Sequence, residues 1–204
     1  MRDSQDELVF ASDDYGDQLM LIPIVPPFAG SIPYVFSNAL VLSGTQRTLS
    51  YGGRTLITKI PASLLLSSGT RIRLTLLSGG IACTLNNVTI SNAATSGNAW
   101  NSASTPTAVT KDGLAAWSLS GPAGSSVVSD EISFNVTGAN ALIVAINADN
   151  TANATRYMNA ISSPNTGVIA YDKASVQEAD DASRGSGYAA SGASAWLISK
   201  LEVA

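Results

Sequence analysis

The sequence predicts an all-β protein, a jelly-roll-like antiparallel sandwich preceded by an extended, proline-rich N-terminal arm. Short runs that alternate between apolar and polar residues are separated by turn residues, which is typical of strands in a sandwich. No segment longer than about ten residues carries the apolar stripe of an amphipathic helix. Four prolines lie close together in the first part of the chain: Pro23, Pro26, Pro27 and Pro33. Proline disfavours the interior of a helix and the central strands of a sheet.

We place the arm at residues 1–50 and the sandwich at residues 51–204. The arm is too apolar for a free linker, so either its own domain or a neighbouring subunit must cover it. We favour the neighbour, which predicts a homotrimer or a larger assembly. The side chains that we expect to make these contacts are Leu21, Ile22, Ile24, Val25, Phe28, Tyr34 and Phe36.

Strands are expected at regular intervals along the sandwich. In the run 70–77, Ile72, Leu74 and Leu76 point to one face and the intervening residues to the other. The run 141–146 is almost continuously apolar, which predicts a central strand covered on both faces. The expected strands are 54–60, 70–77, 81–91, 108–110, 115–119, 127–128, 131–136, 141–146, 168–171 and 195–203, with polar loops at 92–107, 149–167 and 178–192.

The composition fits a folded domain and argues against some partners. Charged residues make up 13% of the 204 residues and apolar residues 45%, which favours an ordered chain. The net charge of −4 and the scattered arginines argue against nucleic acid. The single cysteine, Cys83, lies among apolar residues and is expected to be buried. Small polar residues suit an extracellular or virion surface, and also an ordinary Ser/Thr-rich sandwich.

The start of the sequence, Met1–Glu7, is polar and acidic and has no apolar run of the signal-peptide type. No stretch reaches the roughly 18 apolar residues of a membrane span. We therefore expect synthesis and folding in a cytoplasm and no contact with a membrane.

Four segments carry a resemblance to a known group of domains. They are Thr70–Leu76, Leu85–Ile90, Ser125–Phe134 and Ala141–Ile146. Together they resemble a β-sandwich of bacteriophage structural proteins, similar to the accessory domain that precedes some SGNH (GDSL-type) hydrolases. The closing Trp196–Val203 is similar to the last strand of the phage version. The resemblance covers about three quarters of the chain, excludes the arm, and implies a jelly roll and a virion setting without a ligand.

The residues that most hydrolytic sites require are missing. The chain has no histidine, which removes Ser-His-Asp and Cys-His sites and histidine-containing zinc sites. Carboxylate groups occur at Asp13, Asp14 and Asp17, at Asp130 and Glu131, and at Glu178, Asp180 and Asp181. We interpret them as solvated loop acids, with a Ca²⁺ site or a two-carboxylate hydrolase as alternatives. We expect no enzyme activity, no cofactor and no metal.

Aromatic residues in polar loops are the candidate ligand site. Trp100 lies beside Asn98 and Asn101, while Tyr157 and Tyr188 lie in later polar loops. Such residues either offer a flat surface on which a sugar stacks or anchor the end of a core. Trp117 and Trp196, by contrast, lie in strands and are expected in the core. The Asn-x-Ser/Thr triplets at Asn87, Asn135 and Asn153 are interpreted as products of composition.

The function expected from these observations is that of a non-enzymatic structural or decoration protein of a tailed-bacteriophage virion. It would form part of the head decoration, a fibre base or the tail, and its partners would be other virion proteins and itself. The alternative is a carbohydrate-binding module that recognises a glycan of the host surface.

Overall fold

The computed structural model describes residues 36, 38–42, 44–50, 52–65, 68–149, 155–161 and 167–204. The chain divides into two units, Met1–Pro33 and Tyr34–Ala204, and every described strand belongs to the second unit. The described residues contain no α-helix and one short 3-10 helix, η1 (Ala62–Leu64). The prediction of an all-β antiparallel sandwich is thereby confirmed. The arm residues Leu21, Ile22, Ile24, Val25, Phe28 and Tyr34 lie outside the described residues.

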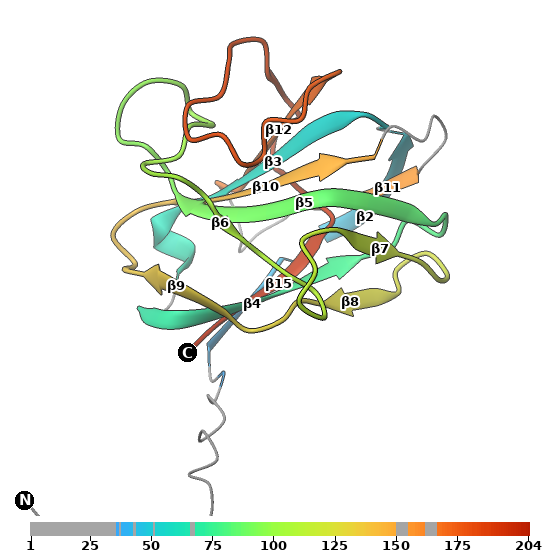
Figure 1. The fold of residues 1–204 in the computed structure, drawn as a ribbon, viewed down its shortest axis with the longest axis horizontal. Coiled ribbons are helices and arrows are strands. Elements are labelled where there is room, and N and C mark those ends of the chain that lie inside the picture. Colours follow the sequence, from blue (N-terminus) through green and yellow to red (C-terminus); the bar gives the residue numbers. More distant parts are fainter. Residues whose placement is uncertain are drawn as a thin grey trace, which may run out of the picture. The chain divides into compact units, whose positions relative to one another are not determined.

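Two antiparallel sheets form the body of the sandwich (Figure 1). The five-stranded sheet has the order β1 (Asn38–Val41), β15 (Ile198–Val203), β4 (Gly69–Leu77) and β8 (Ser126–Val128), and β9 (Ile132–Val136) also pairs with β4. The seven-stranded sheet has the order β13 (Ala189–Ala190), β12 (Ile169–Ala174), β3 (Arg54–Ile60), β10 (Leu142–Ala148), β5 (Cys83–Asn92) and β6 (Thr107–Ala108), and β7 (Trp117–Leu119) also pairs with β5.

A third, smaller sheet is formed by β14 (Ser194–Trp196), β11 (Thr155–Ile161) and β2 (Gly44–Ser50). The chain crosses between the two large sheets several times, because β3 lies in the seven-stranded sheet, β4 in the five-stranded one, β5 to β7 in the seven-stranded one, β8 and β9 in the five-stranded one, and β10 in the seven-stranded one. The jelly-roll topology stays a prediction.

The main core lies between the two large sheets. The alternation in β4 places Ile72, Leu74 and Leu76 in it, all fully buried as the sequence predicted. The central strand β10 is buried along its whole length. Its residues Leu142, Val144 and Ile146 face this core, while Ile143 and Ala145 face a second apolar cluster on the other side of the sheet. The prediction of a strand covered on both faces is therefore confirmed.

The buried tryptophans and the cysteine also follow the prediction. Trp196 is fully buried, Trp117 is almost fully buried, and Cys83 is a buried free cysteine. Both indole N–H groups have backbone acceptors, Val109 O for Trp117 at 3.0 Å and Tyr171 O for Trp196 at 2.9 Å. Because of these bonds, each indole ring is buried in the apolar core without leaving its N–H group unpaired.

Three expectations differ from the structure. The sheets begin at Asn38, so the proposed boundary at residue 50 falls after β1 and β2, which pair with β15 and β11. The expected loop 149–167 contains β11, whose backbone partners in β2 and β14 come from distant parts of the sequence. The expected strand 195–203 is two strands in different sheets, because Leu197 has a φ of 59° that turns the chain between them.

Candidate functional site

Two loops cover the outer face of the seven-stranded sheet and form a third layer (Figure 1). We call loop 93–106 and loop 175–188 together the loop layer. The outer-face side chains Ile57, Ala145 and Tyr171 pack against Ala179 and Tyr188 of the second loop. The loop layer thus has an apolar core of its own and is fixed to a rigid sheet.

Side chains of three adjacent strands hydrogen-bond the backbone of the second loop. Asn147 of β10 accepts from Ala179 N at 3.0 Å, and Thr55 of β3 accepts from Glu178 N at 2.9 Å. Thr89 of β5 donates to Ala179 O at 2.7 Å. These bonds satisfy buried backbone groups that a loop cannot pair within itself, so the loop has a defined position.

Arg184 joins the two loops and is almost fully buried, with 2% of its surface exposed. Its guanidinium donates to Glu178 O at 2.9 Å, Ala179 O at 2.7 Å, Trp100 O at 2.7 Å and Ser102 Oγ at 3.0 Å. Burial lowers the pKa of Arg184, although the group remains charged because the ordinary pKa of arginine is so high. The cation is therefore held by neutral acceptors that all belong to the loop layer.

The aromatic side chains gather beside Arg184. The Trp100 ring centroid lies 5.2 Å from that of Tyr188, at an interplanar angle of 36°, and 5.5 Å from that of Tyr171, at 61°. The indole N–H of Trp100 donates to Gly185 O at 3.1 Å. Tyr171 and Tyr188 are buried and Trp100 is partly exposed, so Trp100 is the member of this cluster that meets solvent.

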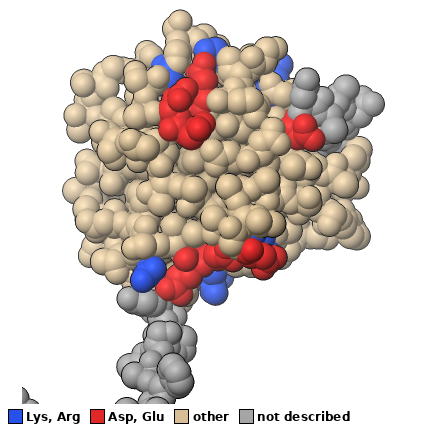
Figure 2. All heavy atoms as spheres, in the orientation of Figure 1, with Lys and Arg blue, Asp and Glu red and all other residues tan. Residues whose placement is uncertain are grey.

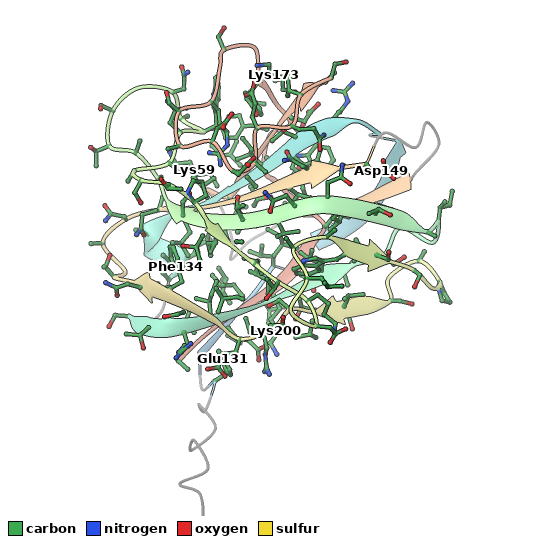
Figure 3. The ribbon with its side chains drawn as sticks, viewed as in Figure 1. Lys59, Glu131, Phe134, Asp149, Lys173 and Lys200 are labelled. Carbon is green, nitrogen blue, oxygen red and sulfur yellow. The ribbon has the colours of Figure 1, made fainter. Side chains whose placement is uncertain are left out.

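Lys173, Glu178 and Tyr188 form a polar group at the border of the aromatic cluster. Lys173 Nζ donates to Glu178 Oε1 at 2.9 Å, and the Tyr188 hydroxyl donates to Glu178 Oε2 at 3.1 Å. Burial favours a neutral Glu178, but the hydrogen bonds from Lys173 and Tyr188 outweigh it and lower the pKa of the carboxyl group. Burial, together with the nearby Glu178 charge, raises the pKa of Tyr188 strongly. The group therefore consists of an ion pair and a neutral phenol near neutral pH (Lys173 is labelled in Figure 3).

Four of the predicted ligand-site residues are close together in this layer. Besides Trp100 and Tyr188, Asn101 Oδ1 accepts from Arg184 N at 3.1 Å, and Asn98 Nδ2 donates to Arg184 O at 3.5 Å. Tyr157 lies in β11, and its side chain is outside the described part of the chain. Sequence reasoning missed the roles of Arg184, Lys173 and Tyr171. No local pattern marks them, since their partners are set by tertiary structure.

Among the predicted loop acids, Glu131 and Glu178 form ion pairs, while Asp130 accepts hydrogen bonds. Asp130 accepts from Thr110 Oγ1 at 2.7 Å, Asp112 N at 2.9 Å and Gly113 N at 2.8 Å. The bond from Gly113 is the largest cause of its lowered pKa. Among the described residues no group of three or more His, Cys, Asp or Glu side chains could hold a metal ion. Asp13, Asp14 and Asp17 lie outside these residues.

Of the expected arm contacts, only Phe36 is described. The Arg73 guanidinium lies over its ring, 4.5 Å from the centroid, so Phe36 packs on β4 of its own sandwich. No helix of the described residues is long and apolar enough to cross a membrane.

The strand order and the loop layer place this protein in the class of all-β antiparallel sandwiches. No protein-family model matches the chain, and no curated protein sequence shows significant similarity to it.

Proposed function

We propose that this protein is a non-enzymatic structural or decoration protein of a tailed-bacteriophage virion, and that its N-terminal segment anchors it to neighbouring subunits. The observation that carries the proposal is the division of the chain after Pro33. A β-sandwich with two apolar clusters follows a separate, proline-rich apolar segment. Apolar surface outside a domain core is most stable when a partner covers it.

The distribution of charge supports an anchoring role. Residues 1–17 contain six acidic residues and one arginine, and no charged residue occurs from 18 to 46. The whole chain has 11 basic and 15 acidic residues, so residues 18–204 keep 10 basic and 9 acidic residues and are nearly neutral. An acidic tip followed by an uncharged apolar stretch favours association with a less acidic partner, such as the sandwich of another copy.

The surface of the sandwich suits close packing in an assembly. The exposed segments 95–99, 103–105, 112–116 and 120–123 consist mainly of Ala, Ser, Thr, Gly and Asn. Figure 2 shows charged side chains at the top and along the lower rim of one face, with a broad uncharged area between them. Small side chains lose little conformational entropy when a partner covers them, whereas Lys and Glu lose up to about 2 kcal/mol each.

Mass spectrometry of gradient-purified virions tests the proposed setting. We expect peptides of this chain at a copy number that follows the symmetry of the particle. Purified particles that lack the chain would refute the virion proposal.

Cross-linking tests the anchoring role in the full-length chain. Unlabelled and ¹⁵N-labelled chains are unfolded together, refolded and treated with a carbodiimide that joins carboxylates to lysines without a spacer. We expect links between residues 1–17 of one label and a lysine of the other label, in species larger than one chain. Links within one label only, or a single-chain mass, would contradict anchoring in trans.

A further inference from the structure

We infer that the loop layer carries a binding site for a neutral pyranose sugar, built on the partly exposed Trp100. This inference does not rest on the proposed virion role, since the site would act in any setting in which the sandwich is displayed. It concerns the residues Trp100, Asn98 and Lys173, with Tyr171, Tyr188 and Arg184 as positioning residues.

The first step of the argument is that Trp100 is held rigidly although it is partly exposed. Tyr188 and Tyr171 pack on its ring, its N–H donates to Gly185 O, and its carbonyl accepts from Arg184. A ring fixed in this way loses little freedom when a ligand stacks on it, so the stacking energy is available for binding.

The second step is the set of polar groups at the border of the aromatic cluster, where Lys173 Nζ lies 5.5 Å from the centroid of the Tyr188 ring. Asn98 is exposed, and its side-chain amide donates a long hydrogen bond of 3.5 Å to Arg184 O. Lys173 keeps 22% of its side chain exposed while one of its three N–H donors bonds Glu178. The amide can donate to and accept from sugar hydroxyls, and the ammonium can donate to them, which provides the few directed contacts that small-molecule sites require.

The third step is that glycines keep the border of this site open. A Cβ atom at Gly185 would come within 3.0 Å of Lys173 Nζ, so the lysine would have to shift by a few tenths of an ångström. A Cβ at Gly187 would meet no atom within 4 Å, and its φ of 91° is one that other residues rarely adopt. The loop beside Trp100 therefore carries no side chain at Gly185, which lies next to Lys173, or at Gly187, which precedes Tyr188 in the sequence.

Charge decides which sugars the site would accept. Arg184 and Lys173 contribute two positive charges, and Glu178, Asp180 and Asp181 contribute three negative ones. Because Arg184 is buried and Lys173 and Glu178 pair with each other, the exposed Asp180 and Asp181 dominate the charge of the surface. Anionic sugars would be repelled, so the site fits a neutral ring.

The test is a glycan array that contains neutral, uronic, sialylated and phosphorylated sugars, followed by titration of the best neutral sugar by isothermal titration calorimetry. Four full-length variants are compared: Trp100→Ala, Trp100→Phe, Asn98→Ala, and Asn135→Ala on β9 as a matched surface control. Thermal unfolding of each variant separates a lost contact from a lost fold.

We expect neutral sugars to bind with a dissociation constant on the order of 1 mM or tighter. Trp100→Ala should lose at least about tenfold in affinity, Trp100→Phe about threefold and Asn98→Ala about threefold, while Asn135→Ala should bind normally. A blank array, a preference for acidic sugars, or equal binding by folded Trp100→Ala would overturn the inference. None of these results bears on the cross-linking test of the proposed function.

Discussion

Arg184 Nη1 donates a 2.7 Å hydrogen bond to the backbone carbonyl of Trp100, a residue 84 positions earlier in the chain. This bond connects the two loops that cover the seven-stranded sheet. It fixes the backbone of the one tryptophan that is neither fully buried nor part of a strand. Through this contact the buried guanidinium of Arg184 helps to position the partly exposed ring of Trp100.

Replacing Arg184 should therefore loosen the loop layer. We expect Arg184→Met to lower the free energy of unfolding by about 2–3 kcal/mol, because buried acceptors at Glu178, Ala179 and Trp100 lose their donor. Hydrogen exchange of the second loop should rise at the same time. Urea denaturation gives the free energy.

The matched control for this variant is Arg71→Met. Arg71 has a third of its side chain exposed and lies 3.7 Å from Glu131, so its loss should change stability by less than about 1 kcal/mol. Equal effects of the two variants would contradict the assigned role of Arg184.

The central strand β10 should be the most sensitive part of the fold. We expect Ile146→Ala to lower the free energy of unfolding by about 3–4 kcal/mol, because the removed side chain is buried between the two large sheets and leaves a cavity. Leu114→Ala, at a position that is 64% exposed, should change it by less than about 0.5 kcal/mol. A difference of less than 1 kcal/mol between the two variants would argue against the packing described for β10.

Residue patterns predicted the strands of the sandwich well, because the buried face of a strand repeats every second residue. The alternation in 70–77 and the apolar run of 141–146 identified β4 and β10 and their burial correctly. The buried Trp117 and Trp196 followed from the same periodicity. This periodicity involves neighbouring residues of one strand, so the sequence alone is enough to predict it.

Features that depend on distant partners were not predictable. β11 lies in a segment rich in Asn, Ala and Thr, and becomes a strand because β2 and β14 pair with it. Polar loops marked Trp100 and Tyr188 as candidates, but gave no sign that Arg184 would lie buried between them. A polar loop residue acquires such a role only when a second loop supplies its acceptors.

Leu197 offers a test of the turn between β14 and β15. Its φ of 59° lies in the left-handed region, which β-branched residues tolerate poorly, and its side chain is almost fully buried. We expect Leu197→Ile to destabilise the protein by about 2–3 kcal/mol through backbone strain added to repacking. Differential scanning calorimetry provides the measurement.

Leu201→Ile is the comparison for Leu197→Ile, since Leu201 is equally buried but lies within β15. The same change there should cost less than about 1.5 kcal/mol. If Leu201→Ile destabilised the protein more than Leu197→Ile, the left-handed backbone conformation assigned to Leu197 would be contradicted.

Acid should weaken the five-stranded sheet through Glu202. The hydrogen bond from Arg73 is the main cause of the lowered pKa of Glu202, and Lys200 adds to it. Glu202 Oε2 lies 2.9 Å from Arg73 Nε, and Glu202 Oε1 lies 2.8 Å from Lys200 Nζ. Because the pKa is lower in the folded state, this stabilisation is complete above the ordinary value of 4.5 and is lost as the pH falls through the folded value.

We therefore expect Glu202→Gln to lower the free energy of unfolding by about 1 kcal/mol at pH 7 and by much less at pH 2.5. Denaturant titrations at a series of pH values measure the difference. Glu131→Gln is the control, because Glu131 is 35% exposed and lies 3.7 Å from Arg71 (Glu131 and Lys200 are labelled in Figure 3). If the difference in the free energy of unfolding between wild type and Glu202→Gln became larger in acid, the stabilising role assigned to ionised Glu202 would be contradicted.

Cryo-electron microscopy of assembled virions tests the proposed anchoring most directly. We predict density for the two-sheet sandwich on the particle, with the first 33 residues of each copy lying on a neighbouring subunit. Particles without this density, or copies whose first 33 residues contact only their own sandwich, would contradict the proposal.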